Sequence, residues 1–213
     1  YCVDDQGHSV RQFTTDGELL LEINTADHPA DTGYVPGQLD SVCRAGPPFN
    51  TPTGVAVTTG GDILVSDGYG NACIHRFNRS GELLHTFGEP GHGPGQFFLP
   101  HGVAVDQDDN MFVADWGNQV LQVFDRDGNF LDVKRGEADL NPWAIEYLEA
   151  QQDEKIARST YVPVYDTDTD DVREISARIE PFFWDPCSVT LDENGRVYVL
   201  ETCRHRFQIF ERI

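Results

Sequence analysis

The sequence has few basic residues and no long hydrophobic run. Its 213 residues include 15 Lys and Arg against 36 Asp and Glu, which gives a formal net charge of −21. A chain this acidic repels phosphate groups, so nucleic acid and anionic membrane surfaces are poor partners for it. No apolar run approaches the roughly 20 residues of a membrane-spanning helix, and no signal peptide opens the chain. The sequence therefore predicts a protein that neither binds nucleic acid nor spans a membrane.

Common catalytic and metal-binding motifs are also missing. The sequence contains no Walker loop, nucleophile elbow, His-Glu-x-x-His or Cys-x-x-Cys, so the enzyme classes built on them are unsupported. The number of cysteines is odd, at five, so at least one thiol has no partner within the chain. What the chain does hold is 39% hydrophobic residues, with 13 Phe, 7 Tyr and 3 Trp, which is enough for a sizeable core.

One order of features recurs along the chain: an apolar strand ending in an acid, a link, a strand ending in Phe, then a turn with Gly. The acid and the Phe are 9 or 10 residues apart in each copy, which are Asp4 and Phe13, Asp67 and Phe77, Asp115 and Phe124, and Glu201 and Phe210. Apolar residues alternate at period 2, and turn residues separate the runs. This pattern indicates short strands and excludes helices.

Each unit begins with a proline, and the prolines set the period. Pro52, Pro100, Pro142 and Pro186 are separated by 48, 42 and 44 residues. A period of roughly 40 to 50 residues with four short strands is typical of a β-propeller blade. We therefore expect an all-β fold, a single propeller domain over residues 1–213. It would comprise a partial blade at 1–25, a loop insertion at 26–48, and blades at 49–88, 97–135, 141–178 and 182–213.

The predicted strands are too few to close a six-bladed ring, so we expect an incomplete ring in this chain. An open ring leaves strand edges exposed, and such edges pair readily with another chain. The partners predicted are therefore a protein or peptide, including a second copy that associates through open blade edges.

Several segments resemble a known family. Residues 91–105, GHGPGQFFLPHGVAV, resemble the linker and first strand of an NHL repeat. Residues 52–57 and 65–71, PTGVAV and VSDGYGN, are most similar to the peptidyl-α-hydroxyglycine α-amidating lyases. That resemblance implies a six-bladed propeller of four-stranded blades, a central zinc ion held by three His, a supporting calcium ion and an extracellular or periplasmic location. The implied reaction is carbon–nitrogen cleavage of peptidyl-α-hydroxyglycine to a peptide amide and glyoxylate.

The resemblance assigns roles to particular residues. It makes Tyr69 the catalytic tyrosine and His101 a zinc ligand. Three positions depart from the family: Cys187 replaces the third ligand His, Ser188 replaces an Asp that contributes to calcium binding, and Trp116 replaces an Arg. Zinc accepts thiolate as readily as imidazole. Loss of the Arg, however, removes a charge that would stabilise negative charge developing in the transition state, and leaves the tyrosine a poor base.

Each of these residues also has a structural interpretation. His101 could be a hydrogen-bonded remnant of a site, Tyr69 an aromatic ring at the channel mouth, Cys187 a small buried side chain and Trp116 a pocket wall. Asp67 and Asp115 recur at one repeat position, near the pocket, as acceptors for the following turn. The remaining histidines are expected to be solvated: His8, His75, His85, His92 and His205.

Two functions remain open. The first is a binding or assembly module with a degenerate lyase-like centre. The alternative is a zinc-dependent peptidylamidoglycolate lyase, so the sequence leaves enzymatic activity undecided.

Overall fold

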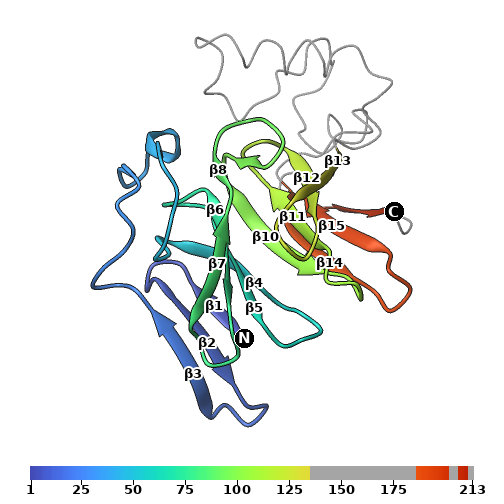
Figure 1. Cartoon of the computed structure of the whole chain (residues 1–213), viewed down its shortest axis with the longest axis horizontal. Coiled ribbons are helices and arrows are strands. Elements are labelled where there is room, and N and C mark those ends of the chain that lie inside the picture. The colour runs from blue at the N-terminus through green and yellow to red at the C-terminus, as the bar shows by residue number, and fades with distance from the viewer. Residues whose placement is uncertain (135–185, 202–205, 211–213) are drawn as a thin grey trace.

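The computed structural model describes residues 1–134, 186–201 and 206–210. These residues form four antiparallel sheets of three or four strands, with no α-helix and one 3-10 turn, η1 (Leu39–Ser41). Figure 1 shows the sheets following one another in chain order around a common centre, without closing a ring. The fold is therefore all-β and part of a β-propeller. The interval 141–178, predicted to be a blade, lies outside the described residues.

Each sheet is a meander in which consecutive strands pair. The first sheet contains β1 (Cys2–Asp4), β2 (Ser9–Phe13) and β3 (Leu19–Asn24). The second contains β4 (Pro52–Val57), β5 (Ile63–Asp67), β6 (Cys73–Phe77) and β7 (Leu83–Phe87). The third contains β10 (Pro100–Val105), β11 (Met111–Asp115), β12 (Val120–Phe124) and β13 (Phe130–Lys134). The fourth contains β14 (Pro186–Leu191), β15 (Val197–Glu201) and β16 (Arg206–Phe210).

Two connections stand apart from the sheets. A short parallel pair, β8 (Glu89–Pro90) and β9 (Gln96–Phe97), links the second sheet to the third. The loop at 26–48 packs on the β5–β6 connection, where the Thr32 hydroxyl donates to the carbonyl of Gly70 at 2.6 Å. Among the described residues, no helix is long and apolar enough to cross a membrane.

Apolar side chains of neighbouring sheets fill the space between them. One cluster joins β10–β13 to β14–β16, with Ala114, Leu121 and Val199 fully buried. A second joins β4–β7 to β10–β13 around Leu64, Ile74 and Phe124. Because burial of apolar surface is the main favourable contribution to folding, this packing holds adjacent blades together. The β14–β16 sheet thus packs directly against β10–β13.

The first strands β4, β10 and β14 lie side by side nearest the centre. Each has a register shift after its proline, and the residue passed over is Thr53, His101 or Cys187. Such a bulge turns one side chain out of the regular alternation. A glycine follows in two of the three strands because the neighbouring strand comes close. A Cβ on Gly54 would lie 2.9 Å from the His101 carbonyl, and one on Gly102 would lie 3.0 Å from the Cys187 carbonyl.

Candidate functional site

The structure brings together four of the residues singled out by the sequence: Tyr69, His101, Trp116 and Cys187, here called the central cluster. His101 and Cys187 are the bulge residues of β10 and β14, while Tyr69 and Trp116 follow the ends of β5 and β11. His101 Nδ1 lies 2.8 Å from the Cys187 carbonyl oxygen, and His101 Nε2 lies 3.0 Å from the Tyr69 hydroxyl. Three sheets therefore supply one hydrogen-bonded group.

The hydrogen bonds fix which imidazole nitrogen carries the proton. A carbonyl oxygen only accepts, so His101 Nδ1 donates to Cys187. In a neutral imidazole Nε2 is then the acceptor, and the Tyr69 hydroxyl must donate to it. Burial lowers the pKa of His101, despite an opposing effect of the Cys187 carbonyl, and burial raises the pKa of Tyr69. Both groups are consequently neutral near pH 7, in agreement with this arrangement.

Three aromatic rings of the central cluster pack edge to face. The rings of Tyr69, His101 and Trp116 are perpendicular to one another within a few degrees, with centroids 5.5 to 6.5 Å apart. All three side chains are partly exposed. Asp5, in the turn between β1 and β2, is close enough for its charge to raise the pKa of both Tyr69 and His101. The cluster thus offers an aromatic surface beside a negative charge.

A zinc ion does not fit the donor set around His101. The thiol of Cys187 donates to the Leu200 carbonyl at 3.5 Å, and the Tyr69 hydroxyl occupies His101 Nε2. Zinc sites in proteins use three or four protein ligands. Within the described ranges, no third candidate donor joins these two residues. Ser188 is exposed on β14 and offers a hydroxyl in place of a carboxylate.

Asp67 and Asp115, assigned by the sequence to the pocket, are 0% exposed and lie inside their own sheets. Each accepts a backbone N–H from the loop ahead of its own first strand: Asn50 donates to Asp67 at 2.7 Å, and Leu99 donates to Asp115 at 3.0 Å. Burial raises the pKa of Asp115 to about 6, against the lowering effect of its hydrogen bonds. These carboxylates anchor the interblade loops.

In each sheet, the acid at this repeat position has a hydrogen-bond partner on the following strand. The residue type of that partner differs between sheets. Arg11, Gln122 and Gln208 occupy one repeat position and bond to the acids of their own sheets. His75 holds this position in the second sheet and bonds to Asp67 at 3.2 Å. It is 0% exposed, so the expectation that His75 is solvated was wrong. Counting back two residues from each repeat Phe would have revealed its equivalence to the glutamines.

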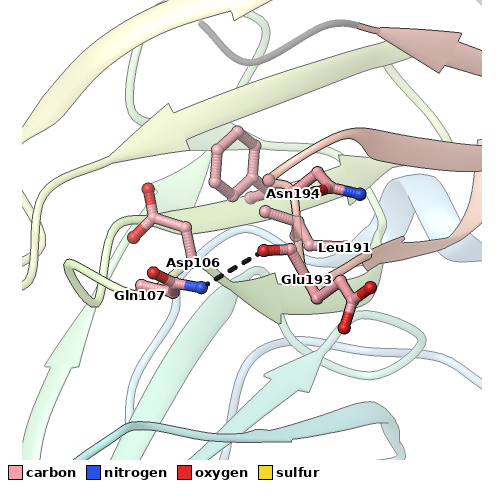
Figure 2. Close-up of a pocket in the computed structure, with 7 residues that line it drawn as sticks. Asp106, Gln107, Leu191, Glu193 and Asn194 are labelled. Carbon is pink, nitrogen blue, oxygen red and sulfur yellow. Dashed lines mark hydrogen bonds between the residues drawn. The ribbon is translucent and has the colours of Figure 1, made fainter.

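A shallow pocket lies between the turns that follow β10 and β14 (Figure 2). Its lining includes Gln107, whose amide donates to the Glu193 carbonyl at 3.4 Å. The corresponding junction of the second and third sheets is filled, because both carboxylate oxygens of Asp109 accept from Thr59, at 2.7 and 3.0 Å. Gly195 holds the position of Asp109 in the fourth sheet. The pocket therefore exists because that position has no side chain.

Comparison with protein families matches the NHL repeat at residues 49–77, 99–124 and 183–210. These matches cover the first three strands of the second, third and fourth sheets. The chain contains three NHL repeats. Its relatives include human NHL repeat-containing protein 3, which is 32% identical over 57% of this chain and 32% of that protein. The chain thus spans about a third of the length of that relative.

Other relatives of this NHL-repeat chain carry enzyme names. Rat peptidylglycine alpha-amidating monooxygenase is 38% identical over 47% of this chain and 11% of that protein. The probable peptidyl-alpha-hydroxyglycine alpha-amidating lyase of Caenorhabditis elegans is 38% identical over 36% of this chain and 23% of that protein. The virginiamycin B lyase structure from Staphylococcus aureus aligns with a TM-score of 0.46 and 12% identity, over 97% of this chain and 50% of that one.

Proposed function

We propose that the chain is a binding module whose central cluster contacts a protein or peptide partner. The observation that carries this proposal is the engagement of His101, whose two ring nitrogens are both bonded within the protein. These bonds hold the imidazole edge to face against Tyr69 and Trp116, so the central cluster offers a fixed aromatic surface to a partner. Partly exposed aromatic side chains such as Tyr69 and Trp116 are also the type that dominates binding energy at protein interfaces. NHL repeats commonly mediate protein interactions, which supports the same function.

The charge of the chain favours a basic partner. The formal net charge is −21, and Asp5 lies near the aromatic rings of the central cluster. A Lys or Arg side chain would meet both a negative potential and the faces of Tyr69 and Trp116, which attract cations. The proposed ligand is therefore a peptide segment with at least one Lys or Arg, and nucleic acid remains excluded as a prediction.

Fluorescence anisotropy with labelled Lys/Arg-rich and Asp/Glu-rich peptides tests this proposal. We expect binding of the basic peptide only, and a loss of roughly 30-fold with Trp116→Ala, since a central aromatic residue typically contributes about 2 kcal/mol. Leu20→Ser on β3, which is 56% exposed and outside the central cluster, is the matched control and should leave binding unchanged. Equal binding of both peptides, or an equal effect of the two substitutions, would overturn the proposal.

The lyase remains a second candidate because two relatives carry amidating-enzyme names. The geometry disfavours it: burial raises the pKa of Tyr69, so the hydroxyl stays protonated, and it donates to His101. Incubation with a peptidyl-α-hydroxyglycine substrate should therefore release no glyoxylate. Release that disappears with His101→Ala would replace the binding module by the enzyme.

Self-association through blade edges is the second part of the proposed function. Among the described strands, β7 and β13 each pair with one neighbour only, and each carries a leucine that is 54% exposed, Leu84 or Leu131. Unpaired, apolar edge strands are templates for another strand. We expect sedimentation velocity to show a larger species as concentration rises, and a Leu84→Lys, Leu131→Lys double variant to abolish it. A monomer at all concentrations would contradict this part alone.

A further inference from the structure

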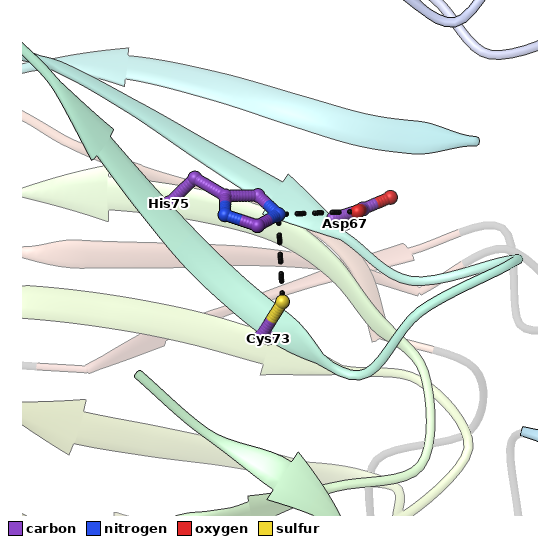
Figure 3. A group of neighbouring side chains, drawn as sticks. All are labelled: Asp67, Cys73 and His75. Carbon is purple, nitrogen blue, oxygen red and sulfur yellow. Dashed lines mark hydrogen bonds and ion pairs between the residues drawn. The ribbon is translucent and has the colours of Figure 1, made fainter. Parts of the chain in front are cut away.

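Three side chains that bind metals in other proteins meet inside the second sheet. Asp67 ends β5, while Cys73 and His75 lie on β6, two positions apart and on the same face (Figure 3). Each is 0% exposed, and their ligand atoms all lie within 4.8 Å of one another. We propose that Asp67, Cys73 and His75 form a binding site for a divalent transition-metal ion of the zinc class. It is separate from the central cluster, which uses other residues.

The spacing of the donors suits a tetrahedral ion. His75 Nε2 lies 3.4 Å from Cys73 Sγ and 3.2 Å from the nearer oxygen of Asp67, Oδ2. With metal–ligand bonds of about 2.0 to 2.3 Å, tetrahedral geometry places neighbouring donors about 3.3 to 3.6 Å apart. The side chains therefore need only small movements to bind. The mixture of sulfur, nitrogen and oxygen ligands fits zinc or cobalt better than calcium or magnesium, which prefer oxygen alone.

Asp67 also has an oxygen that lacks a partner. Its Oδ1 is buried and accepts no hydrogen bond from any described residue. A buried carboxylate oxygen without a hydrogen bond is costly and rare in native proteins, and a bound ion can compensate it. If Asp67 binds through both oxygens, the chelating carboxylate occupies one corner of the site and Oδ1 gains a partner.

The charges and protons of the site balance. The ion carries +2, and the ligands would be the Asp67 carboxylate, the Cys73 thiolate and a neutral His75, so the buried assembly has no net charge. Binding releases the thiol proton of Cys73 to solvent. The imidazole keeps one proton, which then resides on Nδ1 and is donated to the Thr86 hydroxyl 2.9 Å away. A hydrogen bond of this kind is the orienting contact found behind most ligating histidines.

The Cys73 thiol is the ligand that must change when the ion binds. Burial raises the pKa of Cys73 well above its ordinary value, against lowering effects of the Gly46 and Ala72 amides. Without an ion the thiol stays protonated, so binding must displace its proton. Asp67 itself is held in place by the amide of Asn71 at 2.8 Å and the backbone N–H of Asn50 at 2.7 Å. The ligands are thus preorganised in the metal-free protein.

The third sheet shows what the same framework looks like without the site. Val120 and Gln122 pair with β11 in the register that Cys73 and His75 have with β5. There, Gln122 donates to Asp115 at 3.2 Å, and both oxygens of Asp115 accept hydrogen bonds. Two substitutions therefore separate an ordinary buried carboxylate from a set of metal ligands. They also supply variants that the fold already accommodates.

The test measures metal on the full chain after refolding with Zn²⁺ or Co²⁺, because the ligands are fully buried and the ion must enter as the sheet forms. We expect about one ion per chain after removal of excess metal. The cobalt form should show a thiolate-to-cobalt charge-transfer band. Zinc at about a hundredfold excess over its dissociation constant should raise Tm by roughly 5 to 10 °C. Cys73→Val and His75→Gln should each lower metal content at least about tenfold.

Two control variants separate this site from the central cluster. Cys187→Ser and His101→Gln should leave the metal content and the cobalt band unchanged. The proposal is overturned if wild type holds no more metal than the Cys73→Val, His75→Gln double variant. It is also overturned if the thiolate band is lost with Cys187→Ser instead. Should a β6 variant fail to fold, the cobalt band of the wild type, present or absent, still decides whether a thiolate binds the ion.

Discussion

The second and third sheets of this NHL propeller have the same strand arrangement. They differ in the hydrogen-bond partners of their buried aspartates, Asp67 and Asp115. Asp115 accepts backbone N–H groups from Phe98 and Leu99 and amide groups from Asn118 and Gln122, so both its oxygens are occupied. Asp67 gathers its hydrogen bonds on one oxygen and leaves the other without a partner. The comparison teaches that one repeat position can have both carboxylate oxygens hydrogen-bonded in one blade and only one in the next.

Removing the anchor of the third sheet should have the largest effect. Asp115→Ala leaves four N–H donors without this acceptor, two of them in buried hydrogen bonds, and should lower the free energy of unfolding by about 4 kcal/mol at pH 5. Urea unfolding followed by circular dichroism measures this loss. Asp125→Ala, in an exposed hairpin turn of the same sheet, is the control and should cost a small fraction of it. A loss below about 1 kcal/mol would show that Asp115 is not an anchor.

The pH dependence of stability should also differ at this residue. The pKa of Asp115 is about 6 in the folded chain, against 3.8 for an ordinary aspartate such as the unfolded chain presents. The folded state therefore binds the proton more tightly, and the stability contribution falls as pH rises from about 4 to about 6. The full change is about 3 kcal/mol. The difference in unfolding free energy between wild type and Asp115→Asn, measured across this range, isolates it. A pH-independent difference would contradict the prediction.

Exchanging the partner residues tests how far the two sheets are equivalent. Gln122→His should destabilise by about 2 kcal/mol, because Gln122 also accepts from Gly95 N at 3.0 Å and donates to the Gln96 carbonyl at 2.6 Å. His75→Gln in metal-free protein should cost less than about 1 kcal/mol, because the amide still reaches Asp67. Differential scanning calorimetry of the two variants gives the comparison. Equal costs would mean that neither sheet is specialised.

The smallest expected effect concerns the junctions between sheets. Gly195→Asp should be more stable than Gly195→Ala by about 1 kcal/mol, because only the carboxylate can copy the contact of Asp109 with Thr59. Both variants carry the same backbone strain, since Gly195 has φ of 77° and Asp109 has φ of 64°. Chemical unfolding of the two variants measures the difference. If the two are equal, the pocket at this junction is not simply a missing side chain.

Much of the architecture could be predicted from the sequence because its information is periodic. The spacing of Pro52, Pro100 and Pro186 predicted three equivalent first strands, and the structure places these strands next to one another. The same alignment predicted that His101 and Cys187 occupy equivalent positions. The alignment could not predict the hydrogen bond between these two residues, because His101 donates to the backbone carbonyl of Cys187 and not to its thiol.

The burial of His75 was missed for a different reason. The acid-to-Phe interval is one residue longer in the second sheet than in the others. An alignment anchored on Asp67 therefore displaces His75 from the column of Gln122 and Gln208, whereas an alignment anchored on Phe77 does not. Whether a polar residue of a sheet is buried depends on the neighbouring sheet that covers it. The sequence of a single strand does not identify that neighbour.

The bulge near the start of each first strand gives this architecture an unusual freedom. The ladder of hydrogen bonds skips one residue there, so this residue has no paired partner on the next strand. Its side chain can therefore differ between blades without altering the pairing of the strands. Successive blades accordingly present a hydroxyl, an imidazole and a thiol at this position, in Thr53, His101 and Cys187. In a propeller of this kind, the side chains at the centre can therefore be substituted one blade at a time while the strands keep their pairing.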